Sequence, residues 1–108
     1  MGDMVLKRVV DIIRECTRTS DAIIRWGGDE FVIAFSELSE KMVPTLGNKI
    51  LDSIRKIDLS GDGIEESITI SMGFSNFKER DKSYMDAIYR ADEALYRAKE
   101  MGRDCWSV

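Results

Sequence analysis

The sequence contains no histidine, a single proline and two cysteines among its 108 residues. Histidine is the commonest general base and metal ligand at neutral pH, so its absence leaves carboxylates as the expected ligands of any metal ion. Carboxylates favour a hard ion such as magnesium. Cys16 and Cys105 follow no metal-binding or redox spacing, and we expect both to be reduced packing residues.

Long apolar runs and an excess of positive charge are also lacking. No stretch of about 18 apolar residues is present to span a bilayer, and Met1-Gly2-Asp3 leads into a helical pattern without a signal segment. We therefore expect a cytoplasmic protein with no membrane contact from this segment. The formal net charge of −4 argues against general affinity for nucleic acid, but it leaves room for a cationic pocket that binds one phosphate ligand.

The composition, 44% hydrophobic and 33% charged, is typical of a globular domain with one modest core. No repeat or linker divides the chain, so residues 1–108 are expected to form a single domain. Apolar residues recur at helical spacing in segments 3–17, 40–56 and 83–101. Short β-favouring segments predict strands at 22–25, 31–35, 67–77 and 105–108. This order of helices and strands indicates an α+β fold.

A double glycine followed by two acids separates the first two predicted strands. Gly27 and Gly28 suit a tight hairpin, and Asp29 and Glu30 could simply be solvated at its tip, so turn structure alone explains the motif. The functional alternative is that the glycines let phosphates approach the backbone closely while the carboxylates bind a divalent cation. A phosphoryl or nucleotidyl transfer site needs these components together.

Residues 25–31 read R-W-G-G-D-E-F, which resembles the signature of the GGDEF family of diguanylate cyclases. Residues 68–73, I-T-I-S-M-G, resemble a later core strand of that family, and residues 91–104 closely resemble its last helix and exit. Gly2 to Leu6 is similar to the segment that enters its early helix. The likeness covers essentially all 108 residues in order.

The resemblance implies an α+β, palm-like (ferredoxin-like) antiparallel sheet flanked by helices. The family's first strand, with another metal-binding aspartate, and the following loop, with a guanine-reading asparagine, would precede Gly2, so we expect an N-terminally truncated domain. In the family that strand lies between the counterparts of segments 31–35 and 67–77. Both segments should then expose unpaired backbone groups, and we expect a second copy to cover them. Direct pairing of the two segments and movement of 105–108 are the alternatives.

The family condenses two GTP molecules into cyclic di-GMP and two pyrophosphates, a Mg²⁺-dependent (or Mn²⁺-dependent) step in bacterial signal transduction. Because two active sites must face each other, the resemblance implies a homodimer. It implies this activity for the domain, with turnover by the truncated chain in doubt. The alternative is a non-catalytic module that binds cyclic di-GMP through an R-x-x-D site. A structural dimerisation fragment without any ligand is a third interpretation.

Four residues of the hairpin receive roles from the resemblance. Asp29 would be a catalytic metal ligand near the attacking ribose hydroxyl, and Glu30 would support the metal or orient that hydroxyl. A carboxylate is a reasonable proton acceptor there because the cation lowers the pKa of the hydroxyl. Gly27 and Gly28 would lie under the triphosphate.

Four further residues match substrate-binding positions of the family. Lys99 and Arg103 would grip the terminal phosphates, and helical spacing puts both charges on one side of a helix end; without the family match they would be ordinary solvated cations. Asp3 would accept hydrogen bonds from the guanine edge, although a helix N-cap is the alternative. Leu6 would line the base pocket, and a core leucine is equally consistent with its pattern.

Residues 18–21 read R-T-S-D at the spacing where many family members carry the inhibitory product site. Arg18 would bind a phosphate or stack on guanine of cyclic di-GMP, and Asp21 would accept hydrogen bonds from the guanine edge. R-x-x-D is a weak motif by itself, because a loop between a helix and a strand contains such polar residues in any case.

Overall fold

The computed structural model describes residues 2–57 and 68–108. The described chain contains the predicted elements in the predicted order, mostly with shorter bounds: α1 (Asp3–Glu15), β1 (Ala22–Arg25), β2 (Glu30–Phe35), α2 (Val43–Arg55), β3 (Ser71–Asn76), α3 (Tyr84–Glu100) and β4 (Trp106–Ser107). Residue 67, the start of the third predicted strand, lies outside the described residues. None of the described helices is long and apolar enough to cross a membrane. Both cysteines are free, as predicted.

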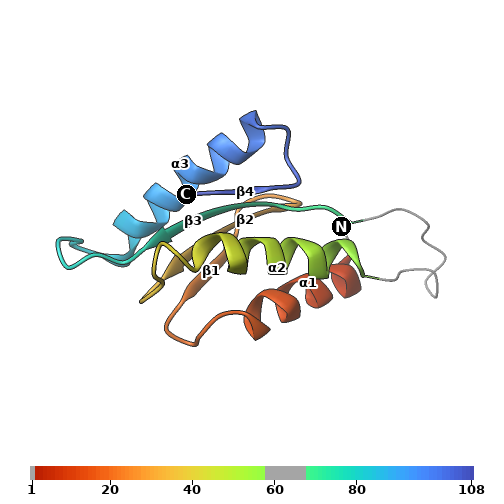
Figure 1. Cartoon of the computed structure of the whole chain (residues 1–108), viewed down its shortest axis with the longest axis horizontal. Coiled ribbons are helices and arrows are strands. Elements are labelled where there is room, and N and C mark those ends of the chain that lie inside the picture. The colour runs from red at the N-terminus through yellow and green to blue at the C-terminus, as the bar shows by residue number, and fades with distance from the viewer. Residues whose placement is uncertain (1, 58–67) are drawn as a thin grey trace.

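The strands form one sheet in the order β1-β2-β3-β4, with α1 and α2 on one face and α3 on the other (Figure 1). β1 and β2 are antiparallel, whereas the β2–β3 and β3–β4 pairs are parallel. The predicted antiparallel sheet is therefore wrong in part. The reason is connectivity: only β1 and β2 are joined by a short hairpin, and helix-containing crossovers lead to parallel neighbours.

β2 and β3 pair with each other along their whole length, from Glu30 opposite Ser71 to Phe35 opposite Asn76. The prediction that these strands expose unpaired backbone groups for a second copy to cover is therefore wrong. Direct pairing, the alternative considered from the sequence, satisfies the donors and acceptors within one chain. It does so without the loss of translational and rotational freedom that association entails.

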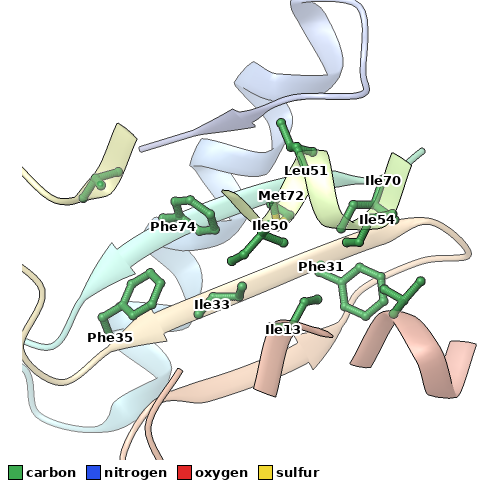
Figure 2. Packing of buried hydrophobic residues seen from close by; sticks show 12 residues of the cluster. Ile13, Phe31, Ile33, Phe35, Ile50, Leu51, Ile54, Ile70, Met72 and Phe74 are labelled. Atoms are coloured by element: carbon green, nitrogen blue, oxygen red, sulfur yellow. The ribbon is translucent and has the colours of Figure 1, made fainter. Parts of the chain in front are cut away.

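The central strands are buried on both faces. Alternate residues of β2, among them Phe31 and Ile33, point with Met72 and Phe74 of β3 toward α1 and α2, where they meet Ile13 and Ile50 (Figure 2). The intervening residues Val32 and Ala34 pack against α3. Because side chains alternate along a strand, the nearly continuous apolar run of β2 supplies both layers at once.

Gly73 allows α3 to approach the sheet very closely. A Cβ atom at this position would lie 2.0 Å from the Ala91 carbonyl oxygen and 2.4 Å from the Leu95 nitrogen, both backbone atoms of α3. The buried face of α3 is correspondingly rich in alanine, with Ala87, Ala91, Ala94 and Ala98 all buried. These small residues fix how α3 lies on β3, and thus where its C-terminal end comes to rest.

We expect Gly73→Ala to lower the free energy of unfolding by about 1–3 kcal/mol, since the new methyl group meets rigid backbone. Gly28→Ala is the matched control, because nothing lies within 4 Å of a Cβ placed there. Urea denaturation followed by circular dichroism compares the two variants. Equal midpoints would show that α3 is not held at the distance described.

The connection from β3 to α3 is held by an ion pair between Asp81 and Arg90. Arg90 donates to both Asp81 carboxylate oxygens at 2.8 Å and to the Asn76 carbonyl, also at 2.8 Å. The Arg90 side chain, then the Lys78 backbone N–H, lower the pKa of Asp81 from 3.8 to about 2. A carboxyl whose pKa is lower in the folded state stabilises the fold above its unfolded pKa, and this contribution disappears as the pH falls through the folded pKa.

Asp81→Asn is therefore expected to lower the melting temperature at pH 7, with a difference from the parent chain that shrinks as the pH falls from about 4 toward about 2. Thermal melts at several pH values measure this difference. Glu79→Gln, an exposed neighbour, is the control and should leave the melting temperature nearly unchanged. A difference between Asp81→Asn and the parent that is independent of pH would contradict the assignment.

Candidate functional site

Arg25 shapes the glycine turn between β1 and β2. Its Nε donates to the Gly27 carbonyl at 3.0 Å and to the Gly28 carbonyl at 3.2 Å, and its Nη2 donates to Gly28 at 3.0 Å. The Trp26 backbone N–H closes the turn by donating to the Glu30 carbonyl at 2.8 Å. One guanidinium thus binds the two turn carbonyls directly before the acidic pair.

The Glu30 carboxylate meets two cations from the end of α3. Its Oε1 lies 3.1 Å from Lys99 Nζ and 3.3 Å from Arg103 Nη1, and the Glu30 side chain is only 16% exposed. The hydrogen bond from Lys99 is the largest influence on the Glu30 pKa and lowers it; burial opposes this effect, and a smaller contribution from the Arg103 hydrogen bond helps to hold the pKa below its usual value. Three of the residues predicted from the sequence are therefore in direct contact.

The fold dictates this convergence. Glu30 belongs to the set of alternate β2 residues that includes Val32 and Ala34, so its side chain points to the face covered by α3. Lys99 lies in the last turn of α3. Figure 1 shows the exit of α3 turning back toward the sheet next to the start of β2.

The chain leaves α3 through an unusual run of left-handed residues. Gly102 has φ 107°, and the two residues after it, Arg103 and Asp104, have φ 64° and 47°. Such angles are uncommon for non-glycine residues and persist only where the surroundings hold them. Here Arg55 of α2 donates to Asp104 Oδ1 at 3.1 Å and to the Asp104 carbonyl at 3.0 Å. This anchor keeps Arg103 directed toward Glu30.

The two hairpin glycines have different surroundings. A Cβ on Gly27 would lie 2.4 Å from Glu30 Oε2, so only glycine leaves room for the carboxylate in its present position. Gly28 has nothing within 4 Å of a Cβ position and is exposed. The first glycine accommodates the Glu30 side chain, and the second leaves open backbone at the surface.

Asp29 lies at the bend just before β2 and is partly exposed, while its carbonyl accepts from the Ser71 N–H at 2.9 Å. Within residues 2–57 and 68–108, no group of three or more carboxylates or cysteines is placed to hold a metal ion. Magnesium usually keeps several waters and binds one or two carboxylates together with substrate phosphates. The pair Asp29 and Glu30 fits that kind of site, in which the ion arrives with a phosphate ligand.

Ser71 is a residue that sequence reasoning missed. It pairs with Glu30 across the sheet, and its fully buried hydroxyl oxygen has no hydrogen-bond partner in the structure. Gly73 and Ser75, the alternate residues of β3, contact α3, so Ser71 faces the same side as the Glu30 carboxylate. An unsatisfied buried hydroxyl here is consistent with a site that binds water or another polar group when complete. The alternation of apolar and smaller residues in segment 67–77 was the sequence signal that could have predicted which face of the sheet Ser71 points to.

Asp3 and Leu6 are not brought to the hairpin by any described hydrogen bond or ion pair. Asp3 is exposed at the first position of α1, and Gly2 rather than Asp3 occupies the N-cap. The N-cap alternative for Asp3 is therefore wrong. Leu6 is partly buried and packs against the cluster that contains Phe31, as the core alternative proposed.

Arg18 and Asp21 lie together, but Asp21 already has protein partners. Its carboxylate accepts from the Arg18 backbone N–H at 2.8 Å, from the Ser36 N–H at 2.8 Å and from the Ser36 hydroxyl at 3.1 Å, and Asp21 is buried. The Arg18 side chain is 71% exposed, with its Nη1 4.0 Å from Glu37 Oε2. An exposed ion pair of that length contributes little, so the guanidinium is accessible.

Two hollows lie away from the glycine hairpin. One of about 370 Å³ is lined by both residues of the R-x-x-D motif together with apolar side chains that include Cys16, Leu38 and Met42. A larger one of about 570 Å³ lies near the opposite ends of β2 and β3, beside Phe35, Asn76 and Trp106. Arg18 therefore borders the smaller hollow.

The family model described as "Diguanylate cyclase, GGDEF domain" matches residues 1–105. The chain is 35% identical over 103 residues to Diguanylate cyclase A of Treponema denticola, covering 95% of this chain and 28% of that protein. It is 35% identical over 104 residues to Diguanylate cyclase DosC of Escherichia coli (strain K12), covering 95% of this chain and 22% of that protein. Diguanylate cyclase DgcM of the same strain is 34% identical over 103 residues, with 95% and 24% covered. The chain therefore spans less than a third of the length of these relatives. Since the family model covers nearly all of it, the chain belongs to the GGDEF domain family of diguanylate cyclases.

Proposed function

We propose that this chain is a nucleotidyl-transfer domain that takes part in the condensation of two GTP molecules to cyclic di-GMP. The observation that carries the proposal is the meeting of Glu30, Lys99 and Arg103 beside the glycine turn. A carboxylate next to two cations and open backbone supplies contacts for a metal-bound triphosphate. The names of the relatives support the same reaction.

In the proposed reaction each ribose 3′-oxygen attacks the α-phosphorus of the other GTP. Two new phosphorus–oxygen bonds form, two bonds to pyrophosphate break, and each attacking hydroxyl loses its proton. Lys99 and Arg103 bind the phosphates that leave, while the Gly27 and Gly28 backbone lies beneath them. Mg²⁺ or Mn²⁺, held by Asp29 and Glu30, would neutralise phosphate charge and lower the pKa of the hydroxyl. Asp29 lies near the attacking hydroxyl, Glu30 supports the metal or orients that hydroxyl, and a carboxylate there accepts its proton.

Base recognition and assembly complete the proposal. Asp3 is exposed at the start of α1, where its carboxylate can accept from the guanine ring N–H and amino group, with Leu6 beside the base. Each protomer brings one GTP, so a homodimer with two facing sites is required for the cyclic product. Bacterial signal transduction in the cytoplasm is the proposed setting.

The 108-residue polypeptide by itself is proposed to bind GTP without converting it. The resemblance gives the family's metal site a further aspartate, and the described residues supply only Asp29 and Glu30 at the hairpin. Loss of a ligand from such a metal site costs several kcal/mol of transition-state stabilisation, or roughly a thousandfold or more in rate.

Calorimetry with GTP and Mg²⁺ should therefore detect binding, while chromatography of the same mixture shows no cyclic di-GMP above a blank. Lys99→Ala is expected to weaken GTP binding about tenfold, because one charge-assisted contact is lost. Lys41→Ala, which removes an exposed cation before α2, is the control. Equal affinities of Lys99→Ala and the parent chain would refute the proposed site.

A second candidate function is binding of cyclic di-GMP without turnover. It is favoured by the accessible Arg18 guanidinium beside the hollow of about 370 Å³. Because Asp21 holds the backbone of residues 18 and 36 together, it acts here by fixing Arg18, and its remaining acceptor capacity is small.

Arg18→Ala is expected to weaken cyclic di-GMP binding by about 1.5 kcal/mol, roughly tenfold in Kd, without a change in melting temperature. Asp21→Asn should lower the melting temperature, since a charge-assisted network is weakened. Calorimetry and thermal melts on both variants separate the ligand role from the structural one. Identical binding heats for Arg18→Ala and the parent would exclude the product site.

A further inference from the structure

The residues proposed to bind opposite parts of the substrate bind each other in the structure. Glu30 is a proposed metal ligand, and Lys99 and Arg103 are proposed phosphate ligands, yet all three form one ion cluster. We propose, resting on the proposed function, that Glu30 is an internal counter-ion that keeps phosphates off Lys99 and Arg103 until a divalent cation takes over its carboxylate. Nucleotide and metal would then bind strongly only together.

The cluster is built around a single carboxylate oxygen. Oε1 of Glu30 serves both Lys99 Nζ at 3.1 Å and Arg103 Nη1 at 3.3 Å. The other oxygen, Oε2, lies over Gly27, where a Cβ would come within 2.4 Å. Glycine at this position therefore lets the carboxylate settle beside the turn and reach both cations at once.

A phosphate without a metal would have to displace this carboxylate. Lys99 and Arg103 would exchange one anion for another, and Glu30, 16% exposed, would be left without its counter-ions beside a new negative charge. A largely buried charge that loses its partners is strongly unfavourable. Little net affinity should remain for a free polyphosphate.

A divalent cation changes the balance because it gives the released carboxylate a partner. The phosphates then take the two cations, the ion takes Glu30 and the phosphate oxygens, and each charge keeps an opposite neighbour. The coupling is reciprocal, so GTP must raise the affinity for the metal by the same factor by which the metal raises the affinity for GTP.

The neighbouring guanidinium groups have other partners in the structure. Arg25 donates to the Gly27 and Gly28 carbonyls, and Arg55 donates to Asp104. Gly73 and the Arg55 anchor hold the end of α3 in place. With the backbone of both segments held, exchange at the cluster takes place by movement of the side chains, Glu30 at the first position of β2 and the more exposed Lys99 and Arg103.

The test measures binding of GTP, and separately of inorganic pyrophosphate, to the 108-residue chain by calorimetry, once in EDTA and once in Mg²⁺. For the parent chain, both ligands should bind at least about tenfold more tightly with Mg²⁺. For Glu30→Gln, affinity in EDTA should rise about tenfold or more, as expected when two charge-assisted contacts are freed. For this variant, the ratio of the affinity in Mg²⁺ to the affinity in EDTA should fall toward one.

Glu100→Gln is the matched control. It removes one negative charge from the same helix end, where the Glu100 carboxylate interacts with Tyr96. Its affinity in EDTA should change by less than about threefold, because a solvent-exposed charge is screened. Arg103→Ala in the Glu30→Gln background should reverse much of the gain, which ties the gain to the freed guanidinium.

Circular dichroism verifies that each variant is folded, and Glu30→Ala, which also removes the charge, replaces Glu30→Gln if the latter is not. If the parent binds GTP with Mg²⁺ but neither Glu30 variant gains affinity in EDTA, the counter-ion proposal is wrong and the proposed function stands. If neither the parent nor any variant binds GTP or pyrophosphate under either condition, both fail.

Discussion

The parallel pairing of β2 with β3 holds together both layers of the molecule. β2 is followed by α2 and β3 by α3, and these helices cover opposite faces of the sheet. The strands pair from Glu30 opposite Ser71 to Phe35 opposite Asn76, and this pairing fixes the position of one helical layer relative to the other. Gly73 then permits backbone contact between β3 and α3. As a consequence, the last turn of α3 ends above the first residue of β2. The meeting of Lys99 with Glu30 follows from this arrangement.

The ion cluster at the hairpin has a different character from the structural ion pair at the other end of β3. Arg90 donates two short hydrogen bonds to Asp81 and one to the Asn76 carbonyl, and the Asp81 side chain is nearly buried. Lys99 and Arg103 share one oxygen of Glu30 and remain partly exposed. The first pair has the bidentate geometry that stabilises a loop. The second has two cations for one carboxylate, which in our proposal lets a metal-bound phosphate replace Glu30.

Asp21 shows how a residue of a functional motif can also be structural. Its carboxylate accepts from the backbone N–H groups of Arg18, before β1, and of Ser36, after β2, next to the accessible Arg18 side chain. Because a buried carboxylate with several donors is costly to disturb, the loop that presents Arg18 is kept in one conformation. The hairpin glycines divide their tasks in a similar way: Gly27 makes room for a side chain, and Gly28 leaves the backbone open.

The sequence alone was sufficient to predict the order of helices and strands and the residues of the glycine turn, because these depend on local periodicity and turn chemistry. The family signature also placed Glu30, Lys99 and Arg103 in one site, and the structure brings them into contact. Beyond the hairpin of β1 and β2, the sequence could not determine which strands pair and in which direction. The strands 31–35 and 67–77 were expected to remain apart, but pairing depends on the free energies of competing long-range arrangements, which leave no local pattern.

Tertiary structure alone decided the direction of individual side chains. In the folded chain Asp21 accepts from backbone N–H groups, and Arg25 donates to the turn carbonyls. The buried Ser71 hydroxyl lies on the same face of the sheet as the Glu30 side chain. The tertiary structure also turned Arg103 back toward the hairpin through left-handed residues anchored by Arg55. Apart from the local contact of Arg25, each of these features joins segments distant in the chain or depends on an uncommon backbone angle. The spacing of residues along the sequence does not encode such long-range contacts or such angles, because they form only when the helices have packed on the sheet.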